Sequence, residues 1–354
     1  MPPTQRPEID LQAAETHARR WGLGGPVREL DSYADRNFVI GGLGGTRHVL
    51  KFAAIDESRA ALELQTEVLT QLAGQPSATR VPRLRPALDG RSLLDLRDAL
   101  GRPCTARALT WIEGGLWSEL STAERTPALR RDLGAALARL DRDLADFEGP
   151  TTAGARGPAF RWNLARAEWI EDELPALEAT PPLDRALIVD TLTRYRAHVQ
   201  PRLDDLPWQL IHGDANDQNL VVDGGEVQGI FDFGDLCLAP AVCDLAIALA
   251  YAAMGGPDQP VLTTERSLAA CAEVSAGYHR VRPLVPLAQV LLYDLLCMRL
   301  CVSVTSSAVA RRLEPANTYL GWSELAAWGL LRSLSQIGRG PFTAAIERTC
   351  ASQV

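Results

Sequence analysis

The sequence feature that most constrains this chain is a short segment, residues 208–235, set between long stretches with helical periodicity. Its apolar runs WQLI, NLVV and QGIF are joined by turn residues, a pattern typical of small strands connected by loops. Within it, Asp214 of HGD is followed five residues later by Asn219, and Asp232 of DFG comes thirteen residues after that. The segment therefore presents two aspartates and an asparagine on strand ends and loops.

The spacing of these three residues suits phosphoryl transfer. That reaction needs an aspartate that orients the attacking hydroxyl group and accepts its proton, and oxygen ligands that hold Mg²⁺ on the phosphates. Kinase catalytic loops provide them as H-R-D-x-x-x-x-N followed by D-F-G, and this chain has H-G-D-x-x-x-x-N followed by D-F-G. Neither tripeptide alone is specific, but both in this order predict a phosphotransferase.

Lys51, in the apolar run RHVLKFA, is the only lysine of the chain, so arginine supplies the rest of its 36 basic residues. A lysine ammonium binds phosphate as a compact point charge, which a planar guanidinium does not replace. With the HGD and DFG motifs downstream, we interpret Lys51 as a strand residue that binds the α- and β-phosphates. The alternative is an arginine-rich composition in which one lysine survives by chance.

Length and composition restrict the class of protein. A chain of 354 residues exceeds one core of typical size and predicts two domains. A net charge of −8, without a run of five basic residues, disfavours a nucleic-acid or membrane partner and suits a small cationic substrate. The seven cysteines form no CxxC pair, and there is neither an apolar signal segment nor a stretch of 18 uninterrupted apolar residues. We therefore expect reduced thiols, a cytoplasmic location and no membrane span; the sequence does not reveal the oligomeric state.

The order of apolar patterns predicts an α+β fold with two domains. A helix near 8–21 precedes the antiparallel strands VREL, NFVI and HVLKFA, and residues 57–73 have a helical stripe. After further strands, Thr126 as N-cap and Pro127 begin a helix whose leucines recur on one face. More helices are predicted near 161–178, 183–199, 240–254, 262–279, 284–309 and 316–335. The predicted domains are a nucleotide-binding lobe, 1–112, and a mostly helical lobe, 113–354, which carries the catalytic loop, 210–235, and the acceptor-binding helices.

Several segments resemble the aminoglycoside phosphotransferase and choline kinase superfamily. They include SYADRNF, LTWIEGG, HGDANDQN and FDFGD with CDLAIALAY shortly after it. Within the superfamily, the chain resembles the hydroxylysine kinase group most closely, over roughly residues 26–335. The resemblance implies a two-lobed, protein-kinase-like fold, with a small antiparallel sheet and one main helix in the first lobe and nucleotide bound in the cleft between the lobes.

The resemblance also implies roles for single residues. Asp214 would be the catalytic aspartate, and Asn219 and Asp232 would be Mg²⁺ ligands. SYADRN takes the place of the loop that covers the phosphates, and Leu109 to Ile112 that of the hinge that binds the purine, either of ATP or of GTP. The expected nucleotide-binding residues are Lys51, Ser32, Tyr33, Asn37, Thr110, Trp111 and Ile112. A glutamate to pair with Lys51 is not evident, because Gln65 falls near its position, flanked by Glu63 and Glu67.

Three further residues are candidates for acceptor binding. Asn216 is what the hydroxylysine kinase group carries where many superfamily members have histidine. Asp235 would either bind a substrate ammonium or cap a turn. Arg299, in an apolar segment, would bind a substrate carboxylate or, as we favour, form a bridge to Asp294 or another buried acid.

Other polar and aromatic residues near the motifs are expected to be structural. His212 should pack and hydrogen-bond beneath the loop, and Asp244 should cap or tether the helix that it begins. Tryptophans 111, 117 and 162 are interpreted as packing residues.

These interpretations predict Mg²⁺-dependent transfer of the γ-phosphate of ATP or GTP to a hydroxyl of a small amine-bearing metabolite, with 5-hydroxylysine as first choice. The alternatives within the same class are kinases of homoserine, choline or ethanolamine and kinases of aminoglycoside or macrolide antibiotics. A nucleotide-binding pseudokinase scaffold is disfavoured, because both aspartates, the asparagine and the lysine are present.

Overall fold

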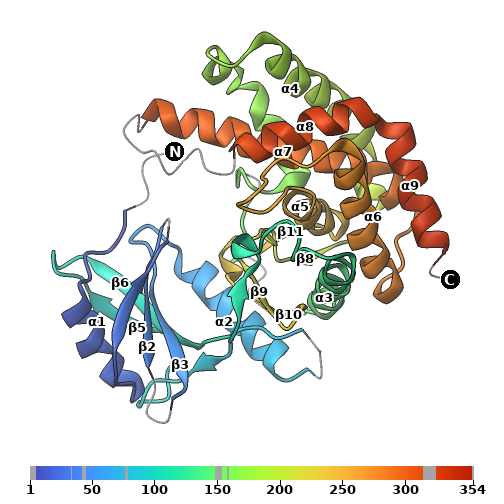
Figure 1. Cartoon of the computed structure of the whole chain (residues 1–354). Helices are drawn as coiled ribbons and strands as arrows, with labels where there is room; N and C mark the ends of the chain where they lie inside the picture. The colour runs from blue at the N-terminus through green and yellow to red at the C-terminus, as the bar shows by residue number, and fades with distance from the viewer. Residues whose placement is uncertain are drawn as a thin grey trace. The chain divides into compact units, whose positions relative to one another are not determined.

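The computed structural model describes residues 5–32, 34–41, 45–75, 79–147, 154–157, 159–313 and 324–352. Strands dominate the first third of the chain and helices most of the rest, which is the predicted α+β class (Figure 1). The chain divides into two compact units. The first comprises 1–76, 80–113 and 148–154, and the second 77–79, 114–147 and 155–354.

The first unit is built on an antiparallel sheet of six strands with the order β1-β2-β3-β6-β4, in which β5 also pairs with β6. The strands are β1 (Val27–Leu30), β2 (Arg36–Gly41), β3 (Arg47–Phe52), β4 (Leu84–Arg85), β5 (Leu94–Arg97) and β6 (Pro103–Thr110). Phe38 and Phe52 are fully buried and meet edge to face, with ring centroids 5.9 Å apart. These apolar strand residues form the core of the unit.

Two helices accompany this sheet, α1 (Leu11–Ala18) and α2 (Arg59–Ala73). The α2 helix begins where the Ser58 side chain accepts the backbone N–H of Ala61, an N-cap that satisfies one of the free donors of the first turn. Its buried stripe includes Leu62, Leu64, Val68, Leu69 and Leu72, as the sequence pattern predicts.

The second unit is mostly helical. Its helices are α3 (Pro127–Ala145), α4 (Pro182–Arg194), α5 (Val242–Ala252), α6 (Thr264–Val281), α7 (Pro286–Leu313), α8 (Glu324–Ile337) and α9 (Arg339–Ala351). As predicted, Thr126 caps α3 by accepting the N–H of Leu129. The α3 and α6 helices pack unusually closely, because a Cβ placed on Gly134 would lie 1.9 Å from the carbonyl oxygen of Val274, and one on Gly277 would lie 1.8 Å from that of Arg131.

Five short strands lie among these helices. They are β7 (Gly115–Leu116), β8 (Trp208–Ile211), β9 (Leu220–Asp223), β10 (Glu226–Ile230) and β11 (Cys237–Pro240). The β9 strand pairs with β10 and β7, and β8 pairs with β11. This pairing fixes the two loops that carry the HGD and DFG motifs, one after β8 and the other after β10.

One helix in the described part of the chain, α7, is long and apolar enough to cross a membrane, with a mean hydropathy of 1.7 in its most apolar window. However, 78% of that window is buried within the protein, and α7 packs against α4, α5, α8 and α9. Its apolar character is therefore that of a core helix.

The predicted elements differ from the observed ones in a few places. The segment predicted as a helix near 161–178 forms two 3₁₀ segments, Leu164–Glu171 and Leu174–Leu177, and the non-helical backbone of Arg166 interrupts the first of them. The helix predicted at 316–335 is described only from Glu324, because 314–323 lie outside the described residues. The sequence interpretation missed β7, β11 and α9.

Candidate active site

The HGD loop (residues 212–219) connects β8 to β9 in the second unit. Gly213 has φ +80°, and a Cβ on it would lie 2.4 Å from the backbone oxygen of Asp235. Only glycine adopts this conformation at so close an approach without strain. The loop that carries Asp214 is thus packed directly against the segment that follows DFG.

Asp214 is held mainly through one of its two carboxylate oxygens. Oδ2 accepts the side-chain N–H groups of Asn216 at 2.8 Å and of Asn219 at 2.9 Å, while Asn219 Nδ2 also donates to the backbone oxygen of Asp214 at 3.0 Å. Oδ1 faces Arg299 Nη2 at 3.3 Å. Burial raises the pKa of Asp214, and the charge of Arg299 opposes this shift. The carboxylate is therefore fixed in orientation, with two donors on Oδ2 and the longer Arg299 contact on Oδ1.

His212 and Asp244 support the loop from below, as the sequence predicts. His212 is fully buried, accepts the N–H of Asp214 at Nδ1 (3.3 Å) and approaches the backbone oxygen of Phe231 with Nε2 (3.1 Å). This pair of contacts places the ring hydrogen on Nε2. Asp244, in the first turn of α5, accepts the N–H groups of His212 and Gly213, each at 2.8 Å.

The DFG segment follows β10, and its first residue has a strained backbone conformation. Asp232 has φ 64° and ψ 80°, and it is the only non-glycine residue with positive φ in the described ranges. Such a conformation persists only where the surroundings impose it, and it is frequent at functional sites. Next to it, Phe233 is buried and packs edge to face on His212. The two motifs are thereby packed together.

Negative charge is concentrated in this part of the second unit. Burial, followed by the nearby charges of Asp214 and Asp232, raises the pKa of Asp235 to about 8. Carboxylates this close together favour a bound cation, which relieves both their repulsion and their loss of hydration.

Asn219 and Asp232 have the chemistry expected of Mg²⁺ ligands. The Asn219 amide nitrogen is committed to Asp214, so its carbonyl oxygen points away from that contact and remains available as a hard oxygen ligand. Within the described ranges, no group of three or more histidine, cysteine, aspartate or glutamate side chains could hold a metal. Few protein ligands suit Mg²⁺, which keeps several waters and binds substrate phosphates. The residues therefore fit the ion.

Of the favoured interpretation of Arg299, a bridge to Asp294 or another buried acid, the structure excludes Asp294 and shows a bridge to another acid. Asp294 instead pairs with Arg194 Nε at 2.9 Å and Arg339 Nη1 at 3.5 Å. Arg299 reaches across to Asp214 and to the hydroxyl of Tyr251, at 3.0 Å. The bridge goes to another partly buried acid because the side chain of Arg299 extends from α7 toward the HGD loop, whereas Asp294 is already neutralised by two arginines.

Two aromatic residues of this cluster were missed or misjudged from sequence. The guanidinium carbon of Arg299 lies 4.8 Å from the ring centroid of Trp162 and 5.5 Å from that of Tyr251. Trp162 thus stacks on a charge and does not merely fill space. Tyr251 follows Asp244 by seven residues, two helical turns, and this spacing is the signal that places both on the face of α5 that meets the loop.

In the first unit, Lys51 is buried in β3 and pairs with Asp35 Oδ2 at 3.5 Å. Asp35 belongs to the SYADRN segment, so a partner of the lysine comes from this segment.

Gln65, the residue nearest the expected position of a pairing glutamate, accepts a hydrogen bond from Arg107 Nη2. The strand register places Lys51 opposite Asn37. Ser32 is also described, whereas Tyr33 lies outside the described residues.

The three predicted hinge residues differ in their backbone bonds. Thr110 N–H donates to Arg83 O at 2.8 Å, and Trp111 N–H donates to Arg47 O at 3.1 Å. The ring of Trp111 also lies under the guanidinium of Arg47, at 4.8 Å. No acceptor is found for the N–H of Ile112 among the described residues, so of these three predicted residues it is Ile112 that has a backbone donor to offer. Lys51 belongs to the first unit and the two motifs to the second, and their meeting around one triphosphate stays a prediction.

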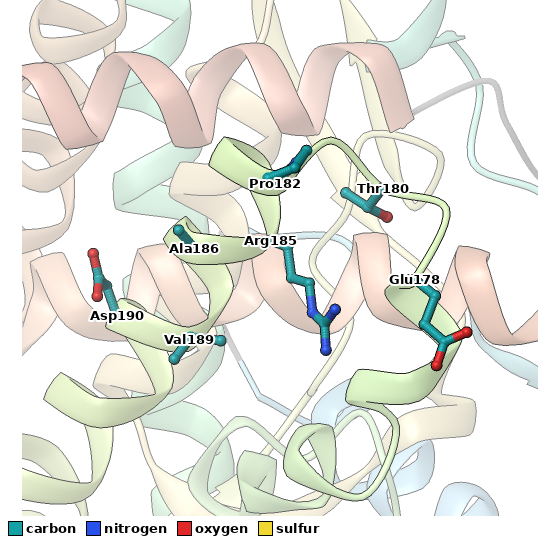
Figure 2. Close-up of a pocket in the computed structure, with 7 residues that line it drawn as sticks. All are labelled: Glu178, Thr180, Pro182, Arg185, Ala186, Val189 and Asp190. Atoms are coloured by element: carbon teal, nitrogen blue, oxygen red, sulfur yellow. The ribbon is translucent and has the colours of Figure 1, made fainter.

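A surface hollow of about 400 Å³ in the second unit is separate from these residues. It lies along the start of α4 and the segment before it, with Arg185 and Glu178 among its lining side chains (Figure 2). None of the predicted site residues lines this hollow, so it is not the site that the motifs define.

Comparison with known proteins identifies the class. Residues 26–284 match the model of the phosphotransferase enzyme family, so the chain belongs to this family. It is a kinase of small molecules. The hydroxylysine kinase of Danio rerio is 28% identical over 317 residues, which cover 86% of this chain and 85% of that protein. The hydroxylysine kinase of Bos taurus is 26% identical over 338 residues, 88% of this chain and 85% of the relative. A homoserine kinase from Methylobacterium radiotolerans is 32% identical over 207 residues, 56% of each chain.

Solved structures confirm the predicted two-lobed, protein-kinase-like fold. An amicoumacin kinase in complex with AMP-PNP, Ca²⁺ and Ami superimposes with a TM-score of 0.69 at 17% identity, covering 94% of this chain and 96% of its own. A microcompartment-associated aminopropanol kinase has a TM-score of 0.67 at 18% identity and covers 97% of this chain and 98% of its own. At these identities the likeness concerns the fold alone.

Proposed function

We propose that this protein transfers the γ-phosphate of ATP or GTP to a hydroxyl group of 5-hydroxylysine, with Mg²⁺ on the phosphates. The observation that carries the proposal is the orientation of Asp214. Two asparagines donate to its Oδ2 at 2.8 and 2.9 Å, while Oδ1 has only the longer 3.3 Å contact with Arg299 and can accept a hydrogen bond from the hydroxyl of an acceptor as well. The choice of acceptor is supported by the hydroxylysine kinases, which align with more than four fifths of this chain.

In this mechanism Asp214 orients the acceptor hydroxyl and accepts its proton as the new bond to phosphorus forms. Asn216 and Asn219 keep the carboxylate in one rotamer, so little reorganisation is needed. The charge of Arg299 favours the ionised form that must receive the proton. Most of the rate acceleration then comes from positioning and from neutralising charge on the phosphates.

The nucleotide and the metal are assigned to separate groups of residues. Lys51 would hold the α- and β-phosphates, and Asn219 and Asp232 would hold Mg²⁺ through one oxygen each. The ion, when bound, supplies neutralising charge on the transferred phosphoryl group. Nucleotide binding by residues 1–112 is part of the same proposal. It assigns Ser32, Tyr33 and Asn37 to the phosphate side and Thr110, Trp111 and Ile112 to the base.

Asp235 is proposed to bind the ammonium group of the acceptor. Its pKa is raised to about 8, first by burial and then by the charges of Asp214 and Asp232. A neighbouring ammonium would offset the cost of ionising this buried carboxyl group. Asp235 also ends a short 3₁₀ turn, Phe233–Asp235, which holds it next to the DFG motif. Homoserine, which carries the same ammonium group and a hydroxyl, is the second candidate acceptor, because a homoserine kinase is 32% identical over part of the chain.

A panel of acceptors tests the proposal. Purified protein with Mg²⁺ and either ATP or GTP would be incubated with 5-hydroxylysine, homoserine, choline, ethanolamine and an aminoglycoside, and each phosphorylated product would be identified by mass spectrometry. We expect the highest kcat/KM with 5-hydroxylysine. Phosphorylation of the aminoglycoside without phosphorylation of 5-hydroxylysine would overturn the choice of acceptor.

A further inference from the structure

Arg299 has unsatisfied hydrogen-bond donors beside Asp214. The residue lies in α7 and is only 2% exposed, yet both of its polar contacts use Nη2, to Asp214 Oδ1 at 3.3 Å and to the Tyr251 hydroxyl at 3.0 Å. Its Nε and Nη1 are buried and have no acceptor among the described residues. A guanidinium has five N–H donors, so more than half of them are without a partner, and burying such donors of a charged group is costly.

This deficit distinguishes Arg299 from the other buried arginines. Within the described ranges it is the only arginine with two buried nitrogens that lack a partner. Arg125, which is 3% exposed, shows the usual arrangement, because Nη1 donates to the backbone oxygens of Met254 and Gly255 and Nη2 to that of Trp117. The exception therefore occurs at the arginine that contacts the proposed catalytic aspartate.

The surroundings of Arg299 define the shape of the missing partner. The rings of Trp162 and Tyr251 lie 4.8 and 5.5 Å from the guanidinium carbon. They cover the guanidinium with apolar surface, so Nε and Nη1 can be satisfied only in the plane of the group. A carboxylate in that plane accepts the hydrogen bonds that such an N–H group donates. Trp162 and Tyr251 are both half-buried, so a ligand that displaces either ring reaches these donors from the surface.

We propose that the unpartnered N–H donors of Arg299 bind the carboxylate of the phosphate acceptor, which makes the acceptor a hydroxy amino acid and not an amino alcohol. The inference rests on the proposed function and narrows its substrate class. Because Nη2 of the same guanidinium touches Asp214 Oδ1, an acceptor with its carboxylate on Arg299 has its hydroxyl at Asp214 when a short saturated chain joins the two groups. Both 5-hydroxylysine and homoserine have this geometry.

The length of the contact between Arg299 and Asp214 suits an exchange of hydrogen-bond partners when the acceptor binds. At 3.3 Å the Arg299–Asp214 bond is long for a hydrogen bond between two charged groups, which is usually about 2.7–2.9 Å. When the acceptor binds, its hydroxyl donates a hydrogen bond to Asp214 Oδ1, and its carboxylate accepts hydrogen bonds from Arg299. Arg299 is then a specificity-determining residue that contacts substrate.

Matched pairs of acceptors test this inference on the unaltered protein. Each pair consists of an amino acid and its decarboxylated amine: 5-hydroxylysine with its decarboxylation product, and homoserine with 3-amino-1-propanol. We expect kcat/KM to be at least about 100-fold higher for the amino acid of the pair that is used. Equal or better use of the amines would overturn the inference while leaving the kinase function in place.

Substitution of Arg299 is the second test of the inference. Arg299→Gln should lower kcat/KM for both members of a pair, because Arg299 also favours the ionised form of Asp214, but it should do so about 30-fold more for the amino acid than for its amine. Equal losses for both would mean that Arg299 acts through Asp214 alone and would refute the inference. Arg299→Lys keeps the charge but loses the planar edge, so it should show the same selective loss even where Arg299→Gln does not fold.

Binding measurements keep the test independent of turnover. Lysine retains the carboxylate and both ammonium groups of 5-hydroxylysine without its hydroxyl, and cadaverine lacks the carboxylate as well. Titration calorimetry with the nucleotide-loaded protein should show at least about ten-fold tighter binding of lysine than of cadaverine, and this preference should vanish in Arg299→Gln. Equal affinities would refute the carboxylate site. Failure of every acceptor to be phosphorylated, with the lysine preference intact, would instead refute the proposed function.

Discussion

Asp244 accepts the backbone N–H of Gly213 at 2.8 Å, so helix α5 holds the HGD loop at the residue just before Asp214. A second layer lies behind this contact. Tyr278 of α6 donates its hydroxyl hydrogen to Asp141 Oδ2 at 2.6 Å, and burial, followed by the charge of Asp244, raises the pKa of Asp141 well above its usual value. These effects favour the neutral form of Asp141 next to Asp244, and the loop rests on three elements of the core.

Asp244→Asn should damage both stability and activity. The asparagine amide would face the N–H donors of His212 and Gly213 with a donor of its own, and at least one of them would be left without an acceptor. We expect a loss of about 3 kcal/mol in the free energy of unfolding and a fall in kcat of at least about ten-fold. Urea unfolding and steady-state kinetics measure the two effects. Asp223→Asn, at an exposed position in β9, is the control and should change neither.

Gly134→Ala should destabilise the second unit. The new methyl group would lie 1.9 Å from the backbone oxygen of Val274 and 2.7 Å from the nitrogen of Tyr278, so α3 and α6 would have to move apart. Overpacking against backbone costs about 3 kcal/mol. Thermal unfolding should show a clearly lower Tm for this variant. At Gly24, where a methyl meets nothing within 4 Å, alanine should leave the Tm nearly unchanged, and similar effects at both sites would contradict the close packing of the helices.

Asp98 should make the stability of the first unit depend on pH in the acid range. Burial raises the pKa of this carboxylate, but the N–H groups of Glu8 and Arg102 and the Arg102 guanidinium lower it more, to about 2. Because the folded-state pKa lies below the unfolded value of 3.8, the stabilisation is fully present above pH 5 and is lost as pH falls toward 2.

The corresponding variant is Asp98→Asn. At pH 7 it should lower the free energy of unfolding by about 2 kcal/mol, because hydrogen bonds to a charged acceptor are lost. Urea titrations between pH 7 and pH 2.5 should show the difference from the unaltered protein shrinking as the acid range is reached. The exposed Asp56 provides the control position. A difference that stays constant with pH would show that the charge of Asp98 contributes nothing.

The sequence predicted well those elements whose signals are local. The Thr126 N-cap and the apolar stripe of α3 needed no tertiary information. The α9 helix was missed because Gly338, Gly340 and Pro341 favour a break. In the structure Gly338 is the N-cap, with φ 75°, and Pro341 lies in the first turn, where its missing N–H costs nothing. Burial of Phe342 and Ile346 on a shared face, together with packing against α6 and α7, decides the outcome.

The parts of the site that could not be predicted depend on contacts between distant residues. The spacing of the HGD and DFG motifs indicated Asp214, Asn219 and Asp232, because short strands and loops fix where these residues lie relative to one another. The partner of Arg299 lies 85 residues away along the chain, and which of several acids it meets depends on how α7 packs. Periodicity gives the buried face of such a helix but not the residue that faces it.

Replacement of Lys51 should weaken the use of nucleotide. Lys51→Met removes the ammonium that we assign to the α- and β-phosphates and leaves Asp35, now 3.5 Å from the ammonium, without that partner. We expect kcat/KM for ATP to fall at least about 100-fold. Lys51→Arg should not rescue it, because a guanidinium is broader and planar. Arg47→Lys, on the same strand but exposed, is the matched control. Normal activity of Lys51→Arg would contradict the need for a compact ammonium.

The most direct test of the account is the turnover of Asp214→Asn. This variant keeps the size of the side chain but removes the group that is assigned to accept the proton of the acceptor hydroxyl. Kinetics with 5-hydroxylysine, or with whichever acceptor the panel identifies, should show kcat reduced about a thousand-fold, while titration with a fluorescent nucleotide should give a Kd within about three-fold of the original. Turnover that remains at the level of the Asp223→Asn control would contradict the assigned role of Asp214 and, with it, the proposed mechanism.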